Sequence, residues 1–101
     1  MSDALLYEVT LEVDPESAEA VERYMRERHI PDIWATGCFR RIRFDRAGPT
    51  TFRTCYEAGS RRDLDRYLDD HAPGFRAEVV AHFPAGISIT RLIWGPVATW
   101  P

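Results

Sequence analysis

Hydrophobic and polar residues alternate in the first regular stretch of the chain, LLYEVTLEV. The residues on one side of this stretch are all apolar or aromatic: Leu5, Tyr7, Val9, Leu11 and Val13. The residues between them include two glutamates and a threonine. A period of two residues is typical of a β-strand with one buried face. We therefore predict a strand over residues 5–13.

The hydrophobic period changes to that of a helix after Asp14. Asp14 is a favourable N-cap and Pro15 suits the first helical position. Four residues then recur at helical spacing: Ala18, Val21, Met25 and His29. A proline disfavours helical backbone at the residue before it. We therefore expect this helix to end ahead of Pro31, with His29 in its last turn.

Three further strands and a second helical region follow. CFRRIRFDR and TTFRTCYEA alternate on either side of a turn at residues 47–49, which predicts a hairpin. SRRD at residues 60–63 resembles a capping box, and helical spacing continues to His71. Pro73 predicts a break, after which the helix resumes as far as Phe83. ISITRLIW, residues 87–94, predicts the last strand.

The order strand, helix, strand, strand, helix, strand predicts the fold. Two right-handed crossovers give a four-stranded antiparallel sheet with the helices on one face, which is the ferredoxin-like α+β arrangement. We expect a single domain over residues 1–101, in which residues 95–101 form a C-terminal tail without a hydrophobic period.

The sheet face turned away from the helices is expected to mix apolar and charged side chains. By alternation this face carries Leu6, Glu8, Thr10, Arg41, Arg43, Arg53, Cys55 and Glu57. Such a mixed surface suits packing against a second sheet. We therefore expect a homodimer of the dimeric α+β barrel type, and a monomer with a solvated sheet face is the alternative.

Composition and charge restrict the class of protein. The chain is 45% apolar and 29% charged, as in ordinary globular domains. No apolar run approaches the roughly 18 residues of a membrane span, and an acid, Asp3, stands where a secretion signal carries basic residues. We expect a cytoplasmic protein with Cys38 and Cys55 reduced. The net charge of −3 and the lack of an isolated basic cluster argue against nucleic acid as a partner.

Three segments resemble a known bacterial family. They are YEVTLEVDPE, HIPDIWATGCF and YEAGSRRDLDRYLDDHAPGFRAEVVAHF, and over them the chain is similar to the DUF4286 family. The resemblance implies the dimeric α+β barrel fold and a small-molecule ligand. That superfamily includes cofactor-free antibiotic-biosynthesis monooxygenases, polyketide cyclases, muconolactone-type isomerases and haem-degrading enzymes, so the resemblance does not select a reaction.

Two histidines and an aspartate are the candidate catalytic residues. His29 and Asp32 flank Pro31, and a neutral imidazole oriented by a carboxylate is a usable general base. The alternative is structural: His29 caps the helix C-terminus and Asp32 binds nearby amides. His71 could face a cleft between the second helix and the sheet, or be satisfied by backbone groups.

Aromatic residues and one arginine are the candidate substrate-binding groups, because small-molecule pockets combine apolar walls with few polar groups. They are Tyr7, Trp34, Phe39, Arg53 and Tyr56. We expect Trp34 at the rim of a cleft and Arg53 beside a substrate oxygen. No tight His/Cys spacing indicates a metal site and no glycine-rich loop indicates a nucleotide, so no metal and no cofactor are expected.

Three functions are consistent with these residues. The leading hypothesis is a cofactor-free cyclase or isomerase of secondary metabolism or aromatic catabolism that acts on a planar apolar substrate by proton transfer. The second is a cofactor-free or haem-dependent monooxygenase of the same fold. The third is a non-catalytic small-molecule-binding module.

Overall fold

The computed structural model describes residues 4–101, and Asp3, the acid near the N-terminus, lies outside the described residues. The elements in chain order are β1 (Leu5–Val13), η1 (Pro15–Ser17), α1 (Ala18–Tyr24), η2 (Met25–His29), α2 (Ile30–Trp34), β2 (Arg41–Ala47), β3 (Thr51–Ala58), α3 (Arg61–Asp70), α4 (Ala72–His82) and β4 (Ile87–Trp94). All neighbouring strands are antiparallel, in the order β2-β3-β1-β4.

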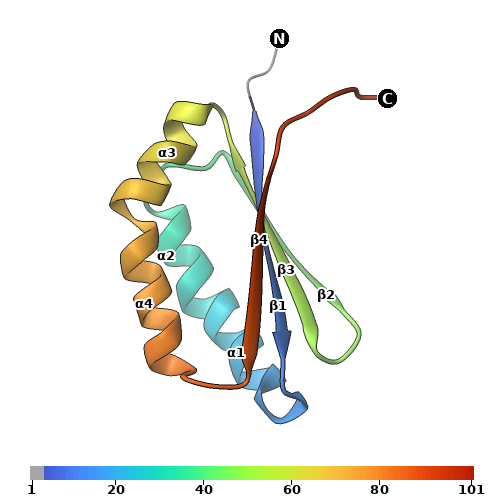
Figure 1. Cartoon of the computed structure of the whole chain (residues 1–101), viewed down its shortest axis with the longest axis vertical. Coiled ribbons are helices and arrows are strands. Elements are labelled where there is room, and N and C mark those ends of the chain that lie inside the picture. Colours follow the sequence, from blue (N-terminus) through green and yellow to red (C-terminus); the bar gives the residue numbers. More distant parts are fainter. Residues whose placement is uncertain (1–3) are drawn as a thin grey trace.

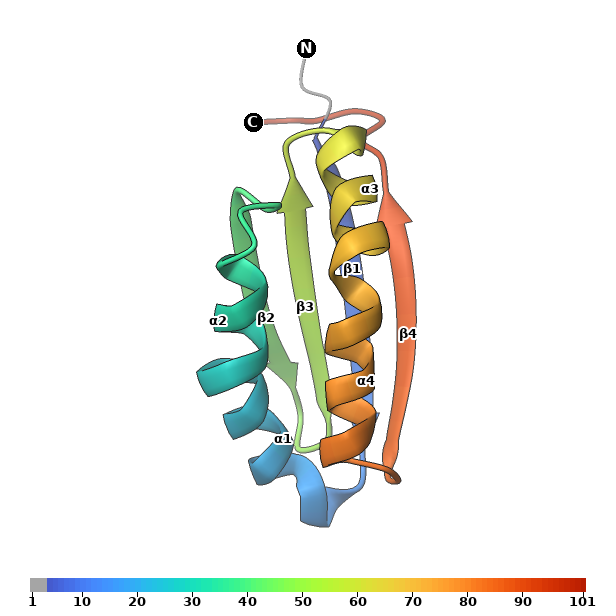
Figure 2. The ribbon, with the colours of Figure 1, turned by 90° about the vertical axis from the view of Figure 1, so that its left-hand side faces the viewer.

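The helices form one layer and the sheet forms the other (Figure 1). Seen from the helix side, α1 and α2 run along the part of the sheet near β2, whereas α3 and α4 run along β1 and β4 (Figure 2). This arrangement confirms the predicted ferredoxin-like α+β fold. Among the described residues, no helix combines the length and the apolar character needed to cross a membrane.

The expected end of the first helix before Pro31 is wrong. Ile30 is helical, with φ −68° and ψ −45°, and the helix continues to Trp34. A proline within a helix clashes with the carbonyl four residues earlier, here that of Glu27. Glu27 lies in η2, a π-helical segment, and the wider turns of a π-helix are a known way to accommodate such a disturbance. As a result His29 lies inside a continuous helical segment, and not at its end.

Two predicted caps have different outcomes. Asp14 makes no side-chain capping bond, because its carboxylate lies against Gly86, and the helical region opens with the 3₁₀ turn η1. The Ser60 hydroxyl oxygen, in contrast, accepts a hydrogen bond from the Asp63 amide at 3.2 Å, as the capping-box pattern predicts. The break between α3 and α4 falls at His71, two residues before Pro73.

The core lies between the helices and the sheet and divides into two clusters of buried side chains. One cluster contains Tyr7, Ile33, Phe39, Tyr56, Leu64 and Tyr67, and the other contains Leu11, Val13, Val21, Tyr24, Met25 and Phe52. Cys38 is buried in the first cluster, whereas Cys55 lies on the opposite sheet face, and both are free thiols as predicted.

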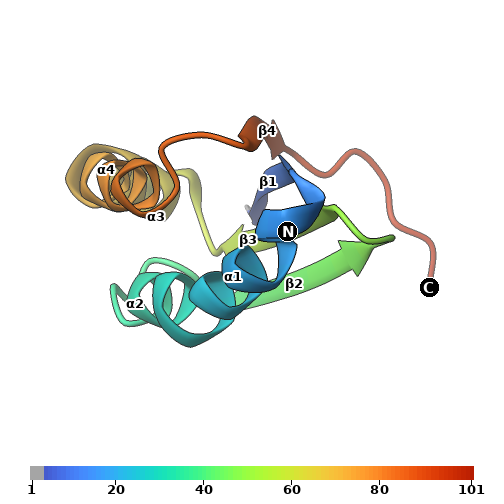
Figure 3. The ribbon, with the colours of Figure 1, turned by 90° about the horizontal axis from the view of Figure 1, so that it is seen from below.

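No element within residues 4–101 forms a layer over the opposite sheet face, which we call the open face. The predicted alternation holds there: Glu8 lies across from Cys55, and Thr10 lies across from Arg53. The face also carries large exposed apolar side chains, Leu6, Leu92 and Trp94. The tail after β4 extends on this side of the sheet, away from the helices (Figure 3).

Candidate functional site

A cavity of about 40 Å³ lies between the helix layer and the sheet, and we call it the helix–sheet cavity. Residues from both layers line it: Tyr7, Val9, Leu11, Met25, His29, Tyr56, Tyr67, Phe75, Arg76, Val79, Ile89 and Arg91. Its wall is mostly apolar and aromatic, and the polar groups are one imidazole, three phenols and two guanidinium groups. That composition is typical of a small-molecule site.

Three tyrosines form one wall of the cavity. The ring centroid of Tyr7 lies 5.7 Å from that of Tyr56 and 6.1 Å from that of Tyr67. Burial raises the pKa of Tyr56 and of Tyr67 well above the ordinary value for a phenol. Both phenols are therefore protonated at neutral pH, and each hydroxyl can donate a hydrogen bond to an oxygen on a ligand.

His29 projects from η2 into the same cavity. Its ring stacks on Tyr24 and meets Phe75 edge to face, each at a centroid distance of 5.9 Å. Burial lowers the pKa of His29 to about 4, although the negative charge of Asp32 acts in the opposite direction. The imidazole is therefore neutral at neutral pH. Its Nδ1 atom is buried and has no hydrogen-bond partner among the described residues.

Two arginines that were not predicted from the sequence complete the cavity. Arg76, on α4, donates a hydrogen bond from its Nη2 to the Tyr7 hydroxyl at 3.1 Å. Arg91, on β4, pairs with Val9 and shares its side of the strand with Ile89 and Ile93. The alternation of ISITRLIW places Arg91 on the helix side of the strand, among isoleucines. A charged residue at such a position could have indicated a polar site in the sequence.

The structure brings part of the predicted site together. His29, Tyr7 and Tyr56 all line the helix–sheet cavity. Phe39 is buried behind it, with its ring 5.1 Å from that of Tyr56 and 4.8 Å from that of Tyr67. Phe39 is thus positioned to support the tyrosine wall and does not line the cavity.

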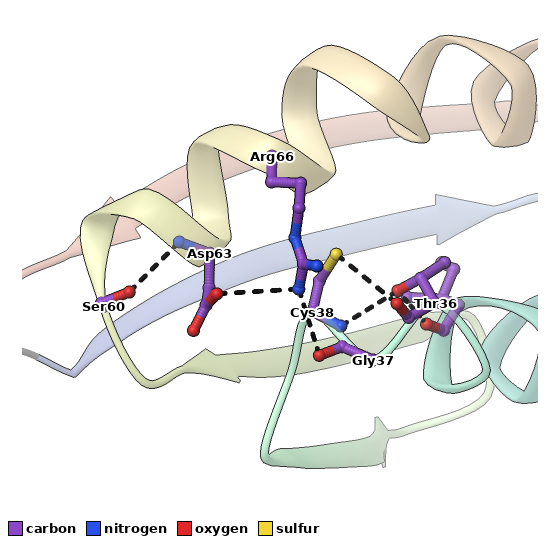
Figure 4. A network of polar contacts seen from close by, with 7 residues as sticks. Thr36, Gly37, Cys38, Ser60, Asp63 and Arg66 are labelled. Atoms are coloured by element: carbon purple, nitrogen blue, oxygen red, sulfur yellow. Dashed lines mark hydrogen bonds and ion pairs between the residues drawn. The ribbon is translucent and has the colours of Figure 1, made fainter.

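A polar network holds the segment that carries Phe39 against α3 (Figure 4). Arg66 donates to the Gly37 carbonyl oxygen at 3.4 Å and pairs with Asp63 at 3.6 Å. The Thr36 hydroxyl donates to the Ile33 carbonyl at 2.7 Å and accepts from the Cys38 amide at 3.3 Å. Gly37 has φ +73°, a left-handed conformation that glycine adopts without strain.

Three other predicted residues lie outside the cavity lining. His71 stacks on Tyr67 at a centroid distance of 6.3 Å, behind the cavity wall. Asp32 is exposed on α2 and influences His29 only through its charge. Arg53 lies on the open face, where it pairs with Asp45 at 3.1 Å.

Trp34 lies in a different hollow, an exposed groove between α2 and β2. The groove is lined by Arg26, Ile30, Pro31, Trp34, Arg40, Arg41, Ile42 and Phe44. Because the helix continues through Pro31, Trp34 projects from its outer surface and is 53% exposed. The structure therefore does not place Trp34 at the rim of a cleft that contains His29.

Metal-ligating side chains do not converge in the described part of the chain. No group of three or more His, Cys, Asp or Glu side chains in residues 4–101 is arranged to hold a metal ion. The chemistry available in the helix–sheet cavity is therefore that of a neutral imidazole, phenolic hydroxyl donors and guanidinium cations.

Comparison with known proteins supports the fold. The family model described as Domain of unknown function (DUF4286) matches residues 4–93. No curated protein matches the chain. A mutant of SnoaB, a cofactor-independent oxygenase from Streptomyces nogalater, has a similar structure, with a TM-score of 0.73, 17% identity, and 99% of each chain covered.

Two further solved structures are similar. A monooxygenase from the gene ActVA-Orf6 of Streptomyces coelicolor, in complex with nanaomycin D, gives a TM-score of 0.70 at 12% identity, over 97% of this chain and 91% of that one. A putative antibiotic biosynthesis monooxygenase from Nitrosomonas europaea gives 0.67 at 18% identity, over 96% and 93%. At these identities the likeness shows the fold alone, which is the ferredoxin-like α+β arrangement described above.

Proposed function

The chain belongs to the DUF4286 family. We propose that it is a cofactor-independent oxygenase acting on a planar aromatic substrate in the helix–sheet cavity. One observation carries the proposal. His29 lines a cavity that also holds phenol donors and cations, and its Nδ1 atom is buried without a hydrogen-bond partner among the described residues. A substrate that presents an acidic C–H or O–H bond to this nitrogen would supply the missing partner.

His29 is suited to act as the base in the first step. Its ring is neutral because burial lowers its pKa to about 4, so it can accept a proton at neutral pH. A weak base is sufficient only where the carbanion is stabilised. The phenols of Tyr56 and Tyr67 can donate hydrogen bonds to a ring oxygen that carries this charge, and Arg76 and Arg91 add positive charge to the same cavity.

The oxygenase reaction balances without a cofactor. A CH₂ group between two aromatic rings loses one proton to His29, and the resulting carbanion forms a C–O bond with O₂. The peroxide takes the first proton back from His29, and the resulting hydroperoxide loses the remaining C–H proton as the O–O bond breaks, which gives a ketone and water. The carbon loses four electrons, and these reduce one O₂ to the ketone oxygen and one water molecule.

The cavity must widen for such a substrate. A volume of about 40 Å³ holds one or two water molecules or a single functional group, and not a ring system. Phe75 and Arg76 line the cavity from α4, and neither residue is fully buried. We propose that a substrate enters by displacing these two side chains, so that the reacting carbon comes to lie beside His29.

A cyclase or isomerase is the second candidate, because it would share the proton abstraction by His29 and differ only in the fate of the carbanion. The oxygenase is placed first because similar structures carry that description. Haem fits less well: His71, the histidine considered for it, stacks on Tyr67 and is absent from the cavity lining.

Oxygen uptake with dithranol, a planar anthrone with an acidic CH₂ group, tests the proposal. We expect catalysed consumption of one O₂ per dithranol, and His29→Phe should lower the rate by roughly 10²- to 10⁴-fold. The matched control is His71→Phe, which keeps a ring against Tyr67 and should remain active. Turnover without O₂ uptake would favour the isomerase, and binding without turnover would favour a binding module.

We further propose that the protein is a homodimer that pairs through the open face. Leu6, Leu92 and Trp94 expose between 39% and 54% of their surface there. Val97 and Trp100 of the tail are 99% and 81% exposed, and the tail extends on the same side of the sheet. Several large exposed apolar side chains on one side of a protein are typical of an association site.

A further inference from the structure

We propose that the mouth of the helix–sheet cavity selects an anionic substrate, a planar aromatic carboxylate whose carboxylate binds Arg76 and Arg91. This inference rests on the cavity being the substrate site, as proposed above, and adds the chemical class of the substrate. It does not depend on which reaction follows.

The placement of Arg91 is the first observation. On its side of β4 the other residues are isoleucines, and its strand partner is Val9. An arginine in an apolar row covers apolar surface with its stem while its guanidinium stays at the surface. Here that guanidinium reaches the cavity, where its charge acts on both Tyr56 and Tyr67.

The absence of a counter-ion is the second observation. The ion pairs of the described residues engage Arg26, Arg40, Arg43, Arg46, Arg53, Arg61 and Arg66. Six arginines have no acidic partner within residues 4–101, and of these six only Arg76 and Arg91 line the helix–sheet cavity. Among the described residues, Arg76 makes one polar contact, a hydrogen bond to the neutral hydroxyl of Tyr7 at 3.1 Å. Two uncompensated cations therefore lie at one mostly aromatic cavity.

The shape and chemistry of the cavity indicate which anion it receives. Guanidinium groups match the two oxygens of a carboxylate. The volume of about 40 Å³ fits one functional group of that size. The aromatic wall of Tyr7, Tyr56 and Tyr67 provides a surface for an attached ring. A planar aromatic acid uses all three features, whereas a neutral aromatic compound leaves both cations unpaired.

Calorimetric titration with 2-naphthoate and with its neutral analogue 2-naphthamide tests the inference. Wild-type protein should bind the carboxylate at least about tenfold more tightly, as expected for charge-assisted hydrogen bonds. Arg76→Met and Arg91→Met keep most of the apolar stem, and each should reduce this preference. The double variant should bind both compounds equally. Arg62→Met, which removes the same charge from an exposed position on α3 outside the cavity lining, should retain the preference.

The site of binding is checked by amide chemical-shift changes, which should concentrate at α4 and β4. Equal binding of naphthoate and naphthamide by wild-type protein would overturn the anion preference and leave the proposed oxygenase site intact. A loss of preference in Arg62→Met equal to that in Arg91→Met would overturn it too, as would shift changes confined to the groove at Trp34. Binding of neither compound would overturn both the inference and its premise, even if dithranol were oxidised elsewhere on the protein.

Discussion

Lowering the pH from 7.5 to 4 should destabilise the folded protein, and protonation of His29 should account for a separable part of that loss. Burial lowers the pKa of His29 to about 4 in the folded chain, whereas the unfolded chain has the ordinary value of about 6.5. As the pH falls, the unfolded state takes up this proton first, so the free energy of unfolding decreases. The contribution of the neutral His29 ring to the free energy of unfolding is fully present above about pH 6.5. It is lost as the pH falls from about 6.5 to about 4, and the free energy of unfolding does not change further through His29 below that pH.

The size of the effect follows from the difference between the two pKa values. About 2.5 pKa units at 1.36 kcal/mol per unit correspond to about 3 kcal/mol. For a chain of this length, that loss lowers the melting temperature by roughly 12–24 °C. An effect of this size is measurable, because the whole stability of a small domain is only about 5–15 kcal/mol.

Urea unfolding from pH 7.5 to 4 measures the effect, with wild-type protein and His29→Phe at the same chain concentration. Phenylalanine keeps a ring beside Tyr24 and Phe75 but cannot take up a proton, so the variant curve contains every other titrating group. The two curves should diverge by about 3 kcal/mol as the pH falls. Parallel curves, or an NMR titration midpoint for His29 near 6.5, would refute the claim that this imidazole is buried and neutral.

Three further predictions concern the fold and its assembly. Light scattering should give about twice the chain mass of 11.6 kDa for wild-type protein and for the control Val80→Asp on α4. Leu92→Asp on the open face should give a monomer. A monomeric wild-type protein would contradict the proposed dimer. Thiol titration of unreduced, denatured protein should find both Cys38 and Cys55 free, because they lie on opposite sheet faces, and fewer than two thiols would contradict this. Ser60→Ala should reduce the free energy of unfolding by about 1 kcal/mol through loss of the N-cap, and an unchanged denaturation midpoint would show that the cap does not stabilise α3.

The strands and the fold class were predictable because their signals are local and repeat along the chain. The alternation in LLYEVTLEV and ISITRLIW gives strands at the same residues as the structure. Pro31 misled the prediction, since the rule that a proline ends a helix considers only adjacent residues. The π-helical segment before Pro31 departs from regular helix, and the hydrophobic pattern of the sequence does not predict it.

The candidate site was only partly predictable, because a cavity depends on which side chains meet across the layers. Tyr7 and Tyr56 were found through strand alternation, which places them on the helix side. Trp34 was expected at the rim of a cleft that includes His29, because that placement assumed a loop after Pro31, and in the structure it lies in the groove between α2 and β2. Arg91 was overlooked although its strand position was known, since its importance appears only when the lack of an acidic partner is seen in three dimensions.

The central claim is that His29 removes a proton from a substrate in the helix–sheet cavity, and hydrogen–deuterium exchange tests it most directly. Dithranol incubated in D₂O without oxygen can exchange its CH₂ hydrogens but cannot be oxidised by O₂, so the measurement isolates the proton transfer. Wild-type protein and His71→Phe should accelerate this exchange well above the rate in buffer, and His29→Phe should return it to nearly the buffer rate. Exchange by His29→Phe as fast as that by wild-type protein would contradict the account.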